Sequence, residues 1–298
     1  MKIAPFIEAV EKQKLNVEGI VVLRHGREAL EPELVRHRWA PETRRNVRSI
    51  AKSFTSIAIG MAIDEGILKL SDKLTQFFSI DTQLRPLQKS RWEAVTLENL
   101  LTMTLGHDKL SRPKNLEEAF SYELTHDPGS VFCYDNTSAI LASAMLTKAS
   151  GLKLRDYLLT RLFLPQGIPA PEWLEISDGF TNGATGLFLT TSEMAIFGQF
   201  LLQRGSWEGK QLVSPAWIDA ATKMQVCVSR KADDYTLGYG YYFWIGEDGT
   251  YRCDGSGGHF IIVLPALDAV IAINSDEENM GGILKAVWDY LIPEISRV

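Results

Sequence analysis

Residues 47–66 read VRSIAKSFTSIAIGMAIDEG and combine a long apolar pattern with two polar side chains near its start. Apolar residues recur every three or four positions, which is the period of an α-helix. These residues are Ile50, Phe54, Ile57, Ala58 and Met61. Gly66 is well placed to end the helix, because glycine readily adopts the left-handed conformation found after many helices. The pattern predicts a helix that begins near Ser49 and ends near Gly66.

Ser49 and Lys52 stand three positions apart at the start of this helix. Side chains at i and i+3 lie on one helix face, so the hydroxyl and the amine are within reach of each other. A serine hydroxyl needs a base before it acts as a nucleophile, and a lysine amine serves only when its pKa is depressed. Burial near the positive end of the helix dipole disfavours the ammonium form. The backbone N–H of Ser49 would also face a developing oxyanion.

The alternative interpretation of this pair is a helix-capping serine and a surface lysine. The same Ser-x-x-Lys spacing recurs at residues 111–114 and 150–153. Pro113 disfavours a helix in the first of these copies, and Gly151 marks a helix end in the second. Only the copy at Ser49 opens a long apolar helix, so Ser49 is the candidate nucleophile.

The segment Tyr134-Asp135-Asn136 adds two groups suited to proton transfer and substrate binding. A tyrosine hydroxyl beside a lysine can relay protons, and an asparagine amide can hold a lysine and a substrate carbonyl together. A turn-like Asp-Pro-Gly precedes the segment and a helical run follows it, which favours a loop facing a cleft. A half-buried tyrosine in a polar turn is the alternative.

A glycine-rich segment, Asp254-Gly255-Ser256-Gly257-Gly258-His259, lies in the strand-like last quarter of the chain. It matches neither the Gly-Asp-Ser-Gly-Gly of chymotrypsin-like proteases nor the Gly-x-Ser-x-Gly elbow of other serine hydrolases. We expect a strand edge that the substrate approaches closely at Gly255, Ser256 and Gly257. The Ser256 N–H would then be a second oxyanion donor. A plain turn between strands is the alternative.

The other periodicities outline the rest of the fold. Helices are expected at 3–14, 97–104, 138–149, 154–162, 192–204, 215–222 and 281–291. Strands are expected at 19–24, 237–245, 259–264 and 269–273. Because strands occur at both ends of the chain with helices between them, the terminal segments should share one sheet beside a helical lobe. The helix that starts at Ser49 would lie at the seam, where ligand clefts usually form.

Composition narrows the possible functions. The 298 residues are 45% hydrophobic and 23% charged with a formal net charge of −6, which excludes a disordered chain and argues against binding to nucleic acid or an anionic membrane. The three cysteines (Cys133, Cys227 and Cys253) and the histidines lack metal-ligand spacing, so we expect reduced thiols, no metal and no cofactor. We see no signal-peptide-like or membrane-spanning run, so the expected location is the cytoplasm and the expected partner a small-molecule substrate.

Taken in order, Ser49-x-x-Lys52, Tyr134-x-Asn136 and the glycine-rich strand near 255–258 resemble the motifs of the penicillin-recognising serine hydrolases. That β-lactamase-related family includes class C β-lactamases, D-alanyl-D-alanine carboxypeptidases, esterases and 6-aminohexanoate-dimer hydrolases. The resemblance extends over most of the chain. Further segments that resemble the family are 48–56, 99–107, 183–187, 197–199, 207–212 and 238–244.

The resemblance implies an α/β fold of the α+β type, similar to β-lactamases and transpeptidases. A mostly antiparallel sheet would be flanked by the terminal helices and joined to an all-helical lobe. A single domain would cover 1–298, with the sheet lobe from about 1–45 and 225–298 and the helical lobe from about 60–225.

The resemblance also implies an acyl-enzyme mechanism. Ser49, deprotonated by the Lys52/Tyr134 pair, would attack a carbonyl, and the oxyanion would rest on the N–H groups of Ser49 and Ser256. Tyr134 would protonate the leaving group, and water would hydrolyse the ester. Whether Lys52 or Tyr134 is the base stays open, because coupled groups share their titration.

One departure from the family bears on the substrate. Penicillin-binding members carry Lys-Thr-Gly or His-Thr-Gly on the third strand, where this chain has residues 251–258. Asp254 would repel a substrate carboxylate if it faced the cleft, and only Arg252 offers a replacement cation. We therefore expect an esterase or amidase acting on a small, uncharged acyl substrate. The alternatives are a β-lactamase or D-alanyl-D-alanine peptidase-like penicillin-binding protein, and a catalytically idle relative that binds a ligand or assembles with itself.

Overall fold

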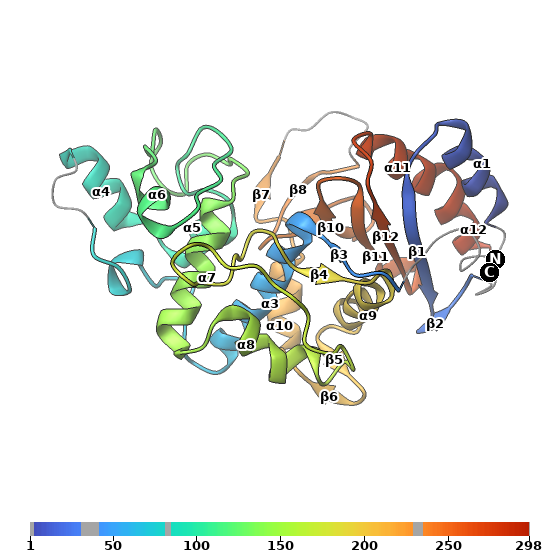
Figure 1. The fold of residues 1–298 in the computed structure, drawn as a ribbon, viewed down its shortest axis with the longest axis horizontal. Helices are drawn as coiled ribbons and strands as arrows, with labels where there is room; N and C mark the ends of the chain where they lie inside the picture. Colours follow the sequence, from blue (N-terminus) through green and yellow to red (C-terminus); the bar gives the residue numbers. More distant parts are fainter. Residues whose placement is uncertain (1–2, 31–41, 81–84, 229–234, 298) are drawn as a thin grey trace.

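The computed structural model describes residues 3–30, 42–80, 85–228 and 235–297, and its largest element is an eight-stranded sheet (Figure 1). The strand order is β2-β1-β12-β11-β10-β9-β8-β7, and all neighbours pair antiparallel. The strands are β1 (Val17–Arg24), β2 (Arg27–Glu28), β7 (Val226–Cys227), β8 (Gly238–Tyr239), β9 (Trp244–Ile245), β10 (Tyr251–Gly255), β11 (His259–Leu264) and β12 (Ala269–Ser275). The expected sharing of one sheet by the two ends of the chain is confirmed, since β1 lies between β2 and β12.

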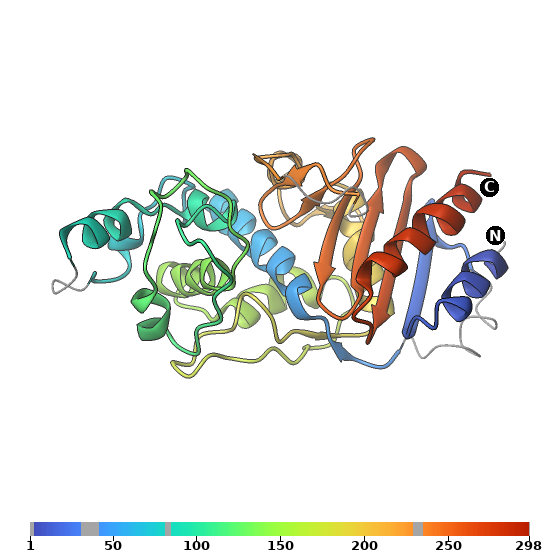
Figure 2. The ribbon, with the colours of Figure 1, turned by 90° about the horizontal axis from the view of Figure 1, so that it is seen from above.

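Helices cover both faces of this sheet, which explains why β11 and β12 are buried along their whole length. Side chains alternate along β11, so that Phe260 and Ile262 face one side while Ile261 and Val263 face the other. The first side packs against the terminal helices, which lie together in Figures 1 and 2. These are α1 (Ala4–Lys12), α11 (Met280–Ala286), η6 (Val287–Leu291) and α12 (Ile292–Ser296). The second side packs against α9 (Thr191–Leu202).

The central part of the chain forms a helical lobe around α3 (Ala51–Asp64), whose residues are buried from Ala51 to Ala62. A helix that is apolar on all sides must be surrounded by protein, and α3 packs against α7 and α10. Phe54 of α3 stacks on Phe197 of α9, which joins the lobe to the sheet. The other elements of the lobe are α4 (Pro86–Ala94), α5 (Leu97–Leu101), α6 (Leu116–Ser121), α7 (Thr137–Ser150), α8 (Leu154–Leu158), η3 (Leu159–Phe163) and α10 (Pro215–Ala221).

The chain enters α3 through a segment held at several points. Strand β3 (Arg45–Asn46) pairs with β4 (Phe188–Leu189), and the Val47 N–H donates to the Leu187 carbonyl at 2.9 Å. The short helix η1 (Arg48–Ile50) follows directly and continues into α3. A second small hairpin, β5 (Ser206–Trp207) and β6 (Lys210–Gln211), lies away from this segment (Figure 1).

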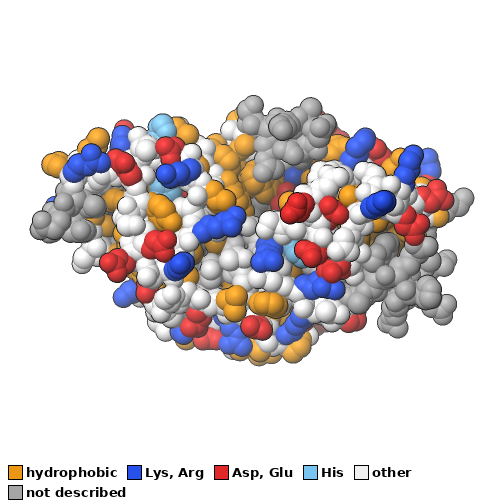
Figure 3. All heavy atoms as spheres, turned by 45° about the horizontal axis from the view of Figure 1, so that its top comes forward, with side chains coloured by type: hydrophobic (Ala, Val, Ile, Leu, Met, Phe, Trp, Pro, Cys, Tyr) orange, Lys and Arg blue, Asp and Glu red, His pale blue; other side chains and the backbone are white. Residues whose placement is uncertain are grey.

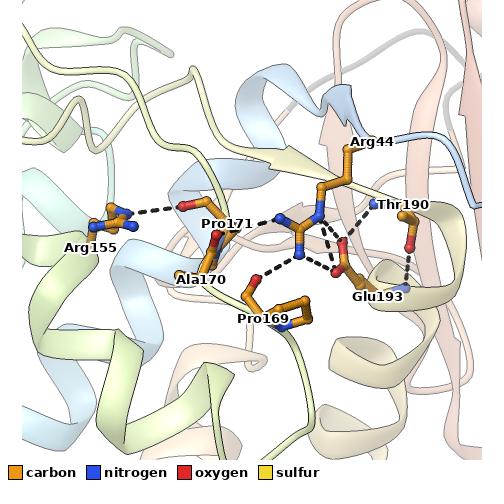
Figure 4. A network of polar contacts seen from close by, with 7 residues as sticks. All are labelled: Arg44, Arg155, Pro169, Ala170, Pro171, Thr190 and Glu193. Carbon is orange, nitrogen blue, oxygen red and sulfur yellow. Dashed lines mark hydrogen bonds and ion pairs between the residues drawn. The ribbon is translucent and has the colours of Figure 1, made fainter.

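An ion pair anchors the same segment from outside (Figure 4). The Arg44 guanidinium donates to both Glu193 carboxylate oxygens and to the carbonyls of residues 169–170. Glu193 also accepts from the Thr190 N–H at 2.9 Å, while the Thr190 hydroxyl accepts from the Glu193 N–H, which makes a capping box at the start of α9. The residues that lead to Ser49 are thereby tied to the sheet-covering helix.

Three expected elements differ from the structure by more than two residues. The run 237–245 is not one strand, because the chain reverses between β8 and β9 with Tyr242 at a φ of 66°. The helix expected over 97–104 ends at Leu101, and Met103 adopts a φ of 57°. The last helix does not stop at 291, since α12 continues to Ser296 with Pro293 in its first turn, where a missing N–H costs little.

The surface mixes charges of both signs. On the face shown in Figure 3, acidic and basic side chains are interspersed over both lobes, in keeping with the formal net charge of −6. In the part of the chain that the structure describes, no helix is both long enough and apolar enough to cross a bilayer.

Candidate active site

Ser49 lies at the middle of η1, at the junction of the two lobes, and is half-buried. Its Oγ is 3.2 Å from Nζ of Lys52, which stands in the first turn of α3. Arg48 precedes it with a φ of 52°, a conformation that costs a non-glycine residue about 1 kcal/mol or more. The structure therefore brings together the hydroxyl and the amine that the i, i+3 spacing predicts.

Lys52 is buried and only 1% exposed. Its Nζ donates to Asn136 Oδ1 at 2.7 Å and to the Ala184 carbonyl at 3.0 Å. Burial lowers the pKa of Lys52 to about 7; the nearby Asp135 carboxyl opposes this shift and Arg112 adds to it. A substantial fraction of the amine is therefore neutral near pH 7.

Tyr134 and Asn136 both contact Lys52, as the Tyr-x-Asn spacing predicts. The Lys52 Nζ lies 4.9 Å from the centroid of the Tyr134 ring, and this ring stacks on Trp244 of β9 at 5.4 Å. Asn136 is the N-cap residue of α7, and its N–H donates to the Ser111 carbonyl at 3.2 Å. The loop before α7 thus holds the phenol and the amide against the lysine.

The glycine-rich segment comprises a strand end and a turn. β10 ends at Gly255, and Ser256, Gly257 and Gly258 form the turn into β11. A Cβ on Gly255 would lie 2.4 Å from the Val47 carbonyl oxygen, two residues before Ser49. Only glycine permits this close approach. The turn with Ser256, which is exposed, therefore lies beside the segment that carries Ser49.

Asp254 lies on the other face of β10 and does not face Ser49. Its carboxylate pairs with the Arg252 guanidinium at 3.1 Å, with side-chain exposures of 9% and 0%. Arg252 also donates to the Tyr235 carbonyl and to Thr236. Because residues two apart share a strand face, Arg252 and Asp254 neutralise each other there. The repulsion considered for Asp254 does not arise, and Arg252 is no replacement cation at Ser49.

Three groups near Ser49 carry no recognisable sequence signal. The Ala184 carbonyl is a backbone atom, so no residue type announces it. Arg112 is exposed and its charge acts on Lys52. His259 is 5% exposed, and its Nδ1 lies 2.9 Å from Asn274 Oδ1. Burial lowers the pKa of His259 to about 4, so this imidazole is neutral near pH 7.

Within residues 3–30, 42–80, 85–228 and 235–297, no three His, Cys, Asp or Glu side chains come together in a group that could hold a metal ion. The groups that converge on Ser49 are an amine, a phenol, an amide and backbone carbonyls or N–H groups. This set is suited to proton transfer and oxyanion binding.

Comparison with known proteins identifies the family of the chain. The family model described as Beta-lactamase matches residues 7–288. Among curated relatives, a β-lactamase of Escherichia coli (strain K12) is 31% identical over 124 residues, which cover 39% of this chain and 31% of that protein. The chain thus matches about a third of the length of that relative.

Solved structures share the fold at low identity. The octameric penicillin-binding protein homologue from Pyrococcus abyssi superposes with a TM-score of 0.72 at 20% identity, covering 98% of this chain and 78% of that one. EstCE1, a hydrolase with promiscuous acyltransferase activity, gives a TM-score of 0.71 at 16% identity, covering 96% and 97%. The fold and the family model, which extends over most of the sequence, lead to one conclusion: the chain belongs to the β-lactamase family of serine hydrolases.

Proposed function

We propose that the protein cleaves an ester or amide of a small acyl substrate through an acyl-enzyme on Ser49. The observation that carries the proposal is the coordination of the buried Lys52 amine. A neutral amine has two N–H bonds, and carbonyl oxygens of Asn136 and Ala184 accept at 2.7 and 3.0 Å. Its lone pair is then left for the Ser49 hydroxyl at 3.2 Å. This is the arrangement that a general base requires.

The reaction follows from these contacts. Ser49 Oγ attacks the substrate carbonyl carbon, and its proton passes to the Lys52/Tyr134 pair. The developing oxyanion is bound by the N–H groups of Ser49 and Ser256, the first at the start of a helix and the second in the turn beside it. Tyr134 then delivers the proton to the leaving group. A water molecule, activated by the same pair, hydrolyses the ester and restores Ser49.

The β10 strand favours an ester or amide over a β-lactam or a peptide carboxylate. The cation that penicillin-binding members place on this strand has no counterpart facing Ser49, because Arg252 is paired with Asp254 on the other face. A substrate carboxylate would therefore lack its usual partner at this position. β-Lactamase or penicillin-binding activity remains the second candidate function, because relatives are named β-lactamase and penicillin-binding protein.

The test is labelling of purified protein and of a Ser49→Ala control with a fluorophosphonate probe, read by intact mass. p-Nitrophenyl acetate, p-nitrophenyl butyrate and nitrocefin are then assayed with both proteins. Labelling and ester turnover that disappear in the control support the proposal. Nitrocefin turnover exceeding ester turnover would favour the β-lactamase alternative. Equal labelling of both proteins, or of neither while folded, would refute the Ser49 assignment and favour an idle binding protein.

A further inference from the structure

An imidazole and a carboxyl group face each other inside the helical lobe, one residue away from the proposed machinery. His107 is 3% exposed and Asp135 0%, and His107 Nδ1 lies 3.5 Å from Asp135 Oδ2. Asp135 accepts from the N–H of Ser138 at 2.7 Å and from its hydroxyl at 3.1 Å. Among the described residues, neither His107 ring nitrogen has a hydrogen-bond partner. Two buried ionisable groups in contact need a reason, because burial of charge is costly.

The position of Asp135 gives that reason. It stands between Tyr134 and Asn136, which both contact Lys52, while its own side chain turns away into the lobe. A buried negative charge at short range favours the ammonium form of Lys52, and the Asp135 carboxyl does raise the pKa of this lysine against the effect of burial. A charge held this deep is weakly screened by solvent.

The surrounding groups are few. Arg112 acts on Lys52 in the opposite direction from Asp135. Burial raises the pKa of Cys133 and of Tyr242, and the Asp135 charge adds to both shifts. Asp108 acts on Cys133 as well. Of these groups, His107 is the one that faces the Asp135 carboxylate directly and can carry a compensating positive charge.

Resting on the proposed role of Lys52, we infer that His107 and Asp135 form a positioning pair that tunes proton transfer between Ser49 and Lys52. Asp135 supplies a fixed negative charge that holds the proton on Lys52 after Ser49 has given it up. A positive charge on His107 offsets part of the Asp135 charge and so weakens its electrostatic effect on the Lys52 amine. Neither group touches the substrate, so the pair acts through Lys52 alone.

The test compares the pH dependence of fluorophosphonate labelling in the intact protein and in Asp135→Asn, which keeps an oxygen for the Ser138 N–H. Loss of the charge should move the midpoint of the acidic limb down by about one pH unit. The matched control is Ser138→Ala, which removes one hydrogen bond from Asp135 but keeps its charge and should leave the midpoint in place. An unchanged midpoint in folded Asp135→Asn would overturn the inference.

His107→Gln provides a second variant in case Asp135→Asn does not fold. Removal of the imidazole should move the midpoint of the acidic limb to higher pH. This shift should vanish when Asp135→Asn is also present, since coupling requires both partners. A shift that persists in the double variant, or none in the single one, would contradict the assigned role of His107.

A direct titration separates this inference from the proposed function. The Lys52 side-chain amine is followed by NMR in lysine-labelled protein, with its signal assigned from Lys52→Arg. If the titration midpoint moves in Asp135→Asn while Ser49 is never labelled, the pair stands and the hydrolase proposal fails. If Ser49 is labelled but the Lys52 midpoint is the same in both proteins, the pair fails and the hydrolase proposal stands.

Discussion

At the scale of the single residue, the proposed chemistry depends on Lys52. At 1% exposure, with an amide and a backbone carbonyl as its hydrogen-bond acceptors, its charged form loses the solvation of water and gains no ion pair in contact within the described residues. An ordinary lysine is almost fully protonated at neutral pH, but this one titrates near the pH at which proteins work. The same burial that weakens its charge makes it a usable base.

The rate of acylation should therefore follow the neutral fraction of Lys52. Because burial lowers the pKa of Lys52 to about 7, the labelling rate should be level above that pH and fall about tenfold per pH unit below it. Lys52→Met should reduce the rate at pH 8 by about 10²–10⁴-fold. The measurement is the rate of fluorophosphonate labelling between about pH 5 and about pH 9. A limb centred near pH 10 would show that Lys52 is not the base.

Tyr134 should affect leaving groups unequally. Tyr134→Phe keeps the ring that stacks on Trp244 and removes only the hydroxyl. Turnover of an alkyl ester or an anilide, whose leaving group needs a proton, should fall about 10²-fold. Turnover of p-nitrophenyl acetate, whose leaving group departs as an anion, should fall far less. Equal losses on both substrates would contradict a role in leaving-group protonation.

The sequence was informative about these residues only where chemistry resides in side chains at fixed spacing. Ser49 and Lys52 meet because a helix brings i and i+3 together, and this can be predicted without coordinates. The Ala184 carbonyl cannot be predicted, because every residue has one. The pairing of Arg252 with Asp254 was open to prediction from strand alternation, but which face they share depends on what covers the sheet.

At the scale of elements, the site depends on one close contact between β10 and the segment before η1. Gly255 lets the strand end approach the Val47 carbonyl, which sets the distance between Ser49 and the Ser256 turn. Backbone is on both sides of the contact, so a side chain there cannot be accommodated by a rotamer change. The position of the proposed oxyanion donors thus rests on the absence of a single methyl group.

Gly255→Ala should separate the two elements. A Cβ placed 2.4 Å from the Val47 oxygen must displace backbone, and overpacking of this kind costs typically about 1–3 kcal/mol. Labelling of Ser49 should fall with it, even under conditions where the variant is folded. The matched control is Gly281→Ala, which has open space in helix α11 and should be neutral or slightly stabilising. Urea unfolding and labelling rates of the two variants give the comparison.

The helices and strands differ in how far the local sequence determines them. α3 and β11 were predictable, since a long helical period and a continuous apolar run between two covered faces leave little choice. The reversal between β8 and β9 was missed, because its aromatic residues are typical of strands. Tyr242 adopts a left-handed conformation there and its side chain is buried, so tertiary packing offsets the backbone strain.

At the scale of the whole molecule, the buried imidazole of His259 joins elements of the sheet to the helix that covers it. Asn274 donates its amide N–H to Thr191, so its Oδ1 accepts from His259 Nδ1. Strands β11 and β12 and helix α9 are joined by this chain of hydrogen bonds. Protonation would place a second proton on a ring that is desolvated and within range of Arg45 and Arg48.

Stability should accordingly fall in mild acid. The folded pKa of His259 is about 4 and its unfolded value is 6.5, so the unfolded chain binds the proton more readily. The contribution of neutral His259 to the free energy of unfolding is complete above pH 6.5 and is lost as the pH falls towards 4. It amounts to about 3 kcal/mol. Urea unfolding across this range should show a smaller loss for His259→Gln than for the unchanged protein. Identical losses would mean that other groups control acid stability.

The pairing of β1 with β12 has a consequence for how the protein is made. β1 leaves the ribosome well before its partner β12, because the helices of the lobe lie between the two strands in the sequence. During that interval β1 has an unpaired edge, and the nascent helical lobe lacks the sheet against which α9 packs. Such exposed edges invite aggregation. Production of the protein in a cell should therefore depend on translation speed and on chaperones that bind incomplete chains.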